Sequence, residues 1–265
     1  MLGIQAANSV IDYALSLGVD FAELFVEQNH VNTVSTLSSE VQAVRSGIDF
    51  GIGIRLVYGF KVLYGYTNKV EVSELKRIVK ELATKDRRDP STQTTNFDYR
   101  KIKESHPAKE TLSKDACIES KIAFLLAADQ RALATSNIIT QTSGSCMQRE
   151  QQVEIFNSEG LHADDTRHYI RASLTAYASD GIEQATGSSN DGGLKGWEIK
   201  DEIDAERTGN EAARQALVNL SAKACPSGRM PVVLGNGFGG VIFHEACGHL
   251  LETCLLYTSP SPRDS

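Results

Sequence analysis

The residues best suited to chemistry are His244, Glu245 and His249, which stand together in an apolar segment directly after a glycine-rich stretch. Two imidazoles can hold a zinc ion, and a glutamate beside the first can activate a metal-bound water. This combination is typical of metallopeptidases. On that interpretation His244 and His249 are the metal ligands, and Glu245 is the catalytic residue that moves the proton.

The spacing of the two histidines departs from the usual zinc helix. The familiar pattern is H-E-x-x-H, with both histidines on one helix face, whereas this chain has H-E-x-x-x-H. At roughly 100° per residue, His244 and His249 would point about 140° apart on an ideal helix. Sharing a metal therefore requires a local distortion, such as a π-type bulge or a break at Gly248. The pattern alone is equally compatible with a structural helix whose polar residues are each satisfied locally.

Residues 231–249 resemble the core motif of the TldD/PmbA family, because the loop, the helix and both histidines agree together: P-V-V-L-G-N-G-F-G-G-V-I-F-H-E-A-C-G-H. They are similar to the TldD branch, which carries the H-E-x-x-x-H element, whereas the PmbA branch lacks these ligands. The resemblance covers residues 1–253. It implies a zinc-dependent peptidase of peptides or unfolded proteins, as a homodimer or as a heterodimer with a non-catalytic PmbA/TldE-like paralogue.

The resemblance also implies that a cysteine far downstream supplies the third zinc ligand, and no position of this chain matches it. Residues 254–265 depart from the family, since they resemble the translation of a sequencing adapter and contain a Ser-Pro-Ser-Pro run at 259–262. A helix that carries a site is not expected to run straight into such a sequence. We expect this tail to be non-native, the natural protein to continue beyond residue 253, and the fragment to be incomplete and inactive.

Two alternatives belong to other functional classes. One is a non-catalytic peptide-binding or assembly subunit of a TldD/PmbA-type complex, for which the histidines and Glu245 would be dispensable. The other is a nucleotide-dependent oxidoreductase, because residues 235–240 contain G-x-G-x-x-G between the apolar run Val232–Leu234 and a helix. A lone match of this kind is weak evidence. We expect these glycines instead to let the backbone pass close to the metal helix or a bound peptide.

Composition narrows the classes of protein. Over 265 residues, 41% are hydrophobic and 23% charged, which is an ordinary globular balance. The net charge of -7 disfavours nucleic acid as a partner. The five cysteines show no paired spacing, so a disulfide framework is not expected, and Cys247 is predicted to be a small buried helix residue. No apolar run approaches the ~20 residues of a membrane span, and no signal peptide is visible. The expected location is the cytoplasm.

The order of helical and alternating patterns predicts an α+β fold with an N-terminal α+β domain over residues 1–85. Apolar residues at helical spacing predict helices over 4–16 and from Ser73 onward. Between them the pattern predicts strands over 21–27, 32–37 and 40–45 and a hairpin within 47–66.

A polar, proline-bounded linker is predicted over residues 86–112, followed by a middle α+β domain over 113–225. Its expected elements are a helix over 113–136, β-strands within 138–188, and a long helix over 201–222. Residues 226–253 are predicted to form only the first strand-loop-helix of a C-terminal metallopeptidase domain, with the strand at Val232–Leu234. His162 and His168 lie in a polar region with Asp164 and Asp165. We expect this group to form a solvent-exposed turn rather than a metal site, and Trp197 to serve in packing.

Overall fold

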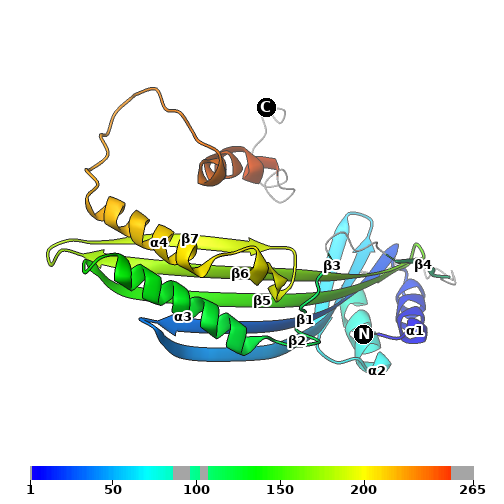
Figure 1. Cartoon of the computed structure of the whole chain (residues 1–265). Coiled ribbons are helices and arrows are strands. Elements are labelled where there is room, and N and C mark those ends of the chain that lie inside the picture. Colours follow the sequence, from blue (N-terminus) through cyan, green and yellow to red (C-terminus); the bar gives the residue numbers. More distant parts are fainter. Residues whose placement is uncertain (1, 86–95, 102–106, 252–265) are drawn as a thin grey trace. The chain divides into compact units, whose positions relative to one another are not determined.

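The computed structural model describes residues 2–85, 96–101 and 107–251 (Figure 1). The chain divides into two compact units, one that ends at Ala222 and one that begins at Lys223. The predicted tail over residues 254–265 lies outside the described residues, as do 86–95 and 102–106 of the predicted linker. Among the described residues, no helix combines the length and apolar character needed to cross a membrane.

The first unit is built on one sheet (Figure 1). Its order is β3-β2-β1-β5-β6-β4, and β7 pairs with β6 as well. Every pairing is antiparallel except that of β4 with β6, which is parallel. The strands are β1 (Phe21–Leu37), β2 (Glu40–Tyr58), β3 (Lys61–Thr67), β4 (Asp98–Lys101), β5 (Ile139–Asn157), β6 (Leu161–Ser179) and β7 (Gln184–Gly193). Helices and an antiparallel-dominated sheet confirm the predicted α+β class.

The strands are longer than their sequence patterns predicted. Segments 21–27 and 32–37 form the single strand β1, which pairs with β5 in an unbroken register from Glu23↔Asn157 to Leu37↔Ser143. One sheet therefore runs through both the predicted N-terminal and the predicted middle segment. Their division into separate domains stays a prediction. The predicted linker also contributes a strand, β4, in its described part.

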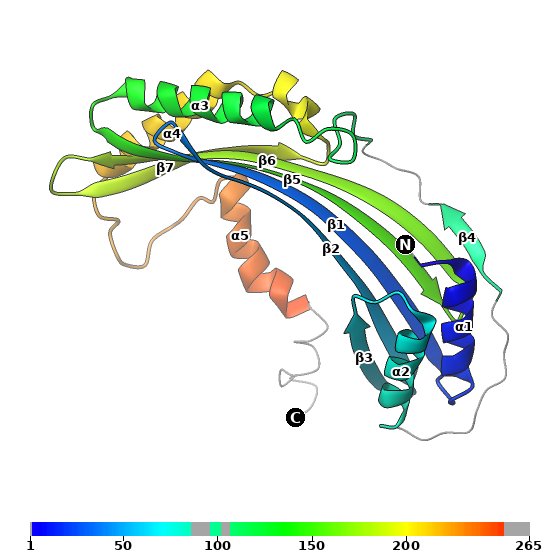
Figure 2. The same cartoon turned by 90° about the horizontal axis from the view of Figure 1, so that it is seen from below.

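Two helix pairs cover opposite ends of this sheet (Figure 2). The first pair is α1 (Ile4–Leu15) and α2 (Val72–Ala83), and their apolar stripes pack on Leu24, Ile54 and other strand residues. The second pair is α3 (Ile118–Thr135) and α4 (Ala205–Leu220). Asp204 caps the N-terminus of helix α4, because its carboxylate accepts from the backbone N–H groups of Glu206 and Arg207, as an N-cap residue should.

The middle of the same sheet face is polar. Side chains alternate along a strand, so even-numbered residues of β1 share one face. Leu24 and Val26 are buried with α1 and α2, and Val34 is buried in the cluster that includes α3 residues. Between them Gln28 and His30 are only partly buried. The two helix pairs thus form separate apolar cores with a polar band between them.

Candidate metal centre

The segment that carries the predicted ligands is helical but irregular. It begins with a 3₁₀ turn at Gly237–Gly239 and the short helix α5 (Gly240–Phe243). The backbone then widens into a π-helical turn at His244–Gly248 and tightens again into a 3₁₀ turn at His249–Leu251. A π-type distortion between the two histidines is one of the two distortions that would let them share a metal.

The π-turn brings the predicted ligands together. The imidazole rings of His244 and His249 lie with their centroids 4.5 Å apart and an interplanar angle of 61°. One ligand atom from each of His244, Glu245 and His249 lies within 4.8 Å of the others. Glu245 Oε2 is 3.4 Å from His249 Nε2. No other group of three histidine, cysteine or acidic residues in the described part of the chain is close enough to hold a metal.

The donor set fits a zinc-type ion. Imidazole nitrogen and carboxylate oxygen are both zinc ligands, and an incomplete protein ligand set leaves positions for water or substrate. His244 and Glu245 are exposed and His249 is half-buried, so water and a peptide can reach the group. Cys247 is exposed and not buried. That prediction was wrong because the apolar residues of this helix, such as Ile242 and Phe243, are themselves exposed in the second unit.

The glycine-rich loop lacks the context of a dinucleotide site. Val232–Leu234 has no strand structure, so the predicted strand before the loop is absent. A dinucleotide fingerprint needs that strand, because it directs the loop and the helix N-terminus at the pyrophosphate. Gly237 has φ of 82°, a left-handed conformation that favours glycine for reasons of backbone geometry alone.

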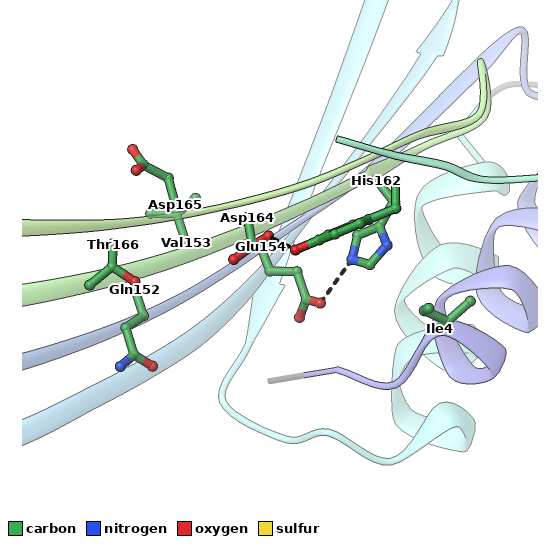
Figure 3. A pocket seen from close by; sticks show the side chains of 9 residues that line it. Ile4, Gln152, Val153, Glu154, His162, Asp164, Asp165 and Thr166 are labelled. Atoms are coloured by element: carbon green, nitrogen blue, oxygen red, sulfur yellow. Dashed lines mark hydrogen bonds and ion pairs between the residues drawn. The ribbon is translucent and has the colours of Figure 1, made fainter. Parts of the chain in front are cut away.

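His162 and His168 were predicted in an exposed turn, and the structure corrects this. Both lie in β6, with 5% and 8% of their surface exposed. His162 Nε2 is 3.0 Å from Glu154 Oε1, and its ring stacks on Phe156 with centroids 4.3 Å apart. Figure 3 shows the His162 and Glu154 side chains facing each other beside Ile4 of α1. Their polar partners come from the neighbouring strand, which no local sequence pattern could indicate.

Two buried ionisable residues of α3 were not predicted from the sequence. Lys121 and Asp129 are each 0% exposed, and burial lowers the pKa of Lys121 and raises the pKa of Asp129. The available signal was their spacing, since both lie four residues from the core residue Leu125 and therefore on its helix face. These residues lie in the first unit and are not part of the metal group.

Comparison with known proteins gives matches to both halves of the first unit. Residues 22–84 match the family description "PmbA/TldA metallopeptidase domain 1", and residues 113–220 match "PmbA/TldA metallopeptidase central domain". The chain is also 31% identical over 262 residues to the metalloprotease TldD homolog of Haemophilus influenzae. That match covers 95% of this chain and 53% of the relative. The chain thus spans about half the length of the curated relatives it matches.

Solved structures agree on the fold. A candidate modulator of DNA gyrase from Bacteroides thetaiotaomicron superposes with a TM-score of 0.68 at 16% identity, covering 84% of this chain and 51% of that one. TldE from Thermococcus kodakarensis superposes with a TM-score of 0.60 at 15% identity, covering 80% and 47%. At these identities the likeness establishes the fold alone.

Proposed function

Because the chain belongs to the PmbA/TldD metallopeptidase family, we propose that it is part of a zinc-dependent peptidase whose first two metal ligands are His244 and His249. The observation that carries the proposal is the π-helical turn at His244–Gly248. It places both imidazoles and the Glu245 carboxylate within 4.8 Å of one another, although an ideal helix would separate the histidines by about 140°.

Glu245 is the proposed general base and acid. A bound zinc ion would supply Lewis acidity toward the scissile carbonyl and toward water. The Glu245 carboxylate is exposed, so it can take the proton from the attacking water and pass it to the leaving amine. Its 3.4 Å contact with His249 puts the carboxylate beside one of the two imidazoles.

The proposed substrates are peptides or unfolded proteins, and the proposed partner is a second copy of this chain or a TldE-like paralogue. The names of the metalloprotease TldD homolog and of the TldE structure support these proposals. Since the chain spans 53% of the first relative, a third metal ligand is expected from residues beyond those matched. The cytoplasmic location stays a prediction.

Metal content tests the proposal directly. The wild-type chain and the variants H244A, H249A and H30A would be dialysed against Zn²⁺ and measured by mass spectrometry. H30A is the matched control, because His30 lies on β1 in the first unit. We expect zinc retention by wild type and H30A and its loss in both other variants. Equal retention in all four proteins would contradict the proposal.

A further inference from the structure

Gly248 closes the π-helical turn and lies directly against His244. A Cβ atom built at residue 248 would lie 2.9 Å from His244 Nδ1, 3.5 Å from its Cγ and 3.6 Å from its Cε1. A carbon–nitrogen distance this short is inside van der Waals contact. The His244 ring therefore occupies the space that any side chain at residue 248 would need.

The other glycines of this segment have no such contact. A Cβ at Gly235, Gly237 or Gly240 would meet no atom within 4 Å, and one at Gly239 would meet only Leu234 Cβ at 3.9 Å. Gly237 has a conformational reason to be glycine, since its φ is 82°. Gly248 is not among the residues with positive φ. Residue 248 thus favours glycine because a side chain would have no room there, and not because of its backbone conformation.

We propose that Gly248 is a positioning residue for the metal ligands, because it lets the His244 imidazole lie beside that of His249. This inference rests on the proposed function of the two histidines. With a methyl group at residue 248, the His244 ring must rotate or the turn must shift. Either movement breaks the arrangement in which the two ring centroids are 4.5 Å apart.

Helix propensity alone predicts that Gly248→Ala stabilises the helix, so weaker metal binding by this variant would need another cause. Glycine is a poor helix former and alanine the best. Gly248→Ala should therefore leave the helix intact or strengthen it if residue 248 has no role toward His244. A variant that folds as well as wild type but binds metal less tightly identifies positioning rather than general destabilisation.

The experiment is a Co²⁺ titration of wild type, G248A and the matched control G240A, followed by visible absorption. We expect G248A to bind at least ~10-fold more weakly, the range seen when residues that orient a ligand are removed, with an altered ligand-field spectrum. G240A should match the wild type. Equal Co²⁺ affinity of G248A and wild type would overturn the inference.

A second measurement needs no metal. Ring contact between His244 and His249 shifts their imidazole Cε1–H resonances in the proton NMR spectrum, and H244A and H249A assign the two signals. We expect G248A to move both signals and G240A to move neither. Unchanged signals in G248A would refute the positioning role whatever the metal results. Wild type that binds Co²⁺ no better than H244A would instead refute the proposed function, and the NMR result would still decide the role of Gly248.

Discussion

The amine of Lys121 on α3 donates a 3.0 Å hydrogen bond to the side-chain carbonyl of Asn32 on β1. Both residues are 0% exposed, so this bond joins helix to sheet without access to water. The Asn32 carboxamide also donates to the backbone carbonyl of Arg45. A buried polar pair of this kind is costly to break and less costly to remove as a whole.

We expect Asn32→Leu to destabilise the chain by roughly 3 kcal/mol, because it leaves the Lys121 amine buried and unpaired. The double variant N32L/K121M should recover much of this loss, since both polar groups are then replaced by apolar ones. Urea denaturation of the single and double variants measures the coupling. Additive losses would show that the two residues do not depend on each other.

Lys121 should also give stability a pH dependence. Burial lowers its folded pKa below the ordinary 10.5, so the unfolded chain binds more protons between the two values. The free energy of unfolding should therefore rise as pH increases from the lowered pKa toward 10.5, and K121M should lack this rise. Urea denaturation of wild type and K121M at a series of alkaline pH values gives the two pH dependences to be compared.

Asp129 should give the opposite pH dependence, in which the free energy of unfolding falls as pH rises. Burial raises its pKa above 3.8, while nearby Thr36, Thr142 and the Ser39 backbone offset only part of the effect. The folded chain therefore holds this proton more tightly than the unfolded chain. Its stabilisation is complete below pH 3.8 and disappears as pH rises through the raised folded pKa.

Asp129→Asn should abolish this dependence and make the chain more stable at neutral pH by on the order of 1 kcal/mol. Urea denaturation of wild type and Asp129→Asn between pH 4 and 8 measures this difference. The two curves of unfolding free energy against pH should converge at low pH. Curves that stay parallel over this range would contradict the assignment to Asp129.

Glu154 is predicted to fasten the N-terminal helix to the sheet. Its carboxylate accepts from the Leu2 backbone N–H at 3.2 Å and contacts His162 Nε2 at 3.0 Å. Glu154→Leu leaves both groups buried without a partner, at about 1–3 kcal/mol each. We expect Glu154→Leu to accelerate amide hydrogen exchange more in α1 than in α4. Glu154→Gln is the conservative control. Uniform acceleration across both helices would indicate global loss of stability rather than release of α1.

Gly209 is predicted to set the approach of α4 to α3. A Cβ there would overlap the Ala128 carbonyl oxygen and lie 3.0 Å from Ala132 N. Gly209→Ala should cost about 1–3 kcal/mol through this crowding, although alanine is the better helix former by ~1 kcal/mol. Gly47→Ala meets no atom within 4 Å and is the control. Thermal denaturation that ranks G209A at or above wild type would refute the prediction.

Catalysis gives one further prediction, which depends on the proposed function. In the active peptidase that we propose, Glu245→Gln should lower kcat by ~10²–10⁴-fold, the usual contribution of a general base. Metal content should stay unchanged, because both imidazoles remain. A variant that loses its metal would instead identify Glu245 as a ligand.

Local periodicity predicted the helices well, because one helix face meets one core. Helix α1 was expected over 4–16 and spans Ile4–Leu15. The continuity of β1 was missed, since its polar middle at Gln28–His30 interrupts the alternation that signals a strand. That polarity reflects the gap between the two helix pairs, which is a property of the assembled sheet. The pairing of β4 with β6 likewise depends on contacts between residues far apart in sequence.

The part of the candidate site that depends on helix geometry was predictable from the sequence. A metal shared by His244 and His249 would require a distortion of the helix, and the π-turn at His244–Gly248 is such a distortion. The roles of these residues stay predictions. The burial of His162 was not predictable, because its environment is made by Phe156 and Glu154 on the neighbouring strand.

The long register between β1 and β5 has a consequence for synthesis. Strand β1 is complete at Leu37, but its partner β5 begins only at Ile139. At ribosomal rates of about 5–20 residues per second, the roughly 100 intervening residues take on the order of 5–20 s to emerge. During that interval one edge of β1 has no partner strand from β5 and is open to pairing with other nascent chains. We therefore expect an aggregation-sensitive period on the ribosome, with chaperone occupancy that peaks before β5 emerges.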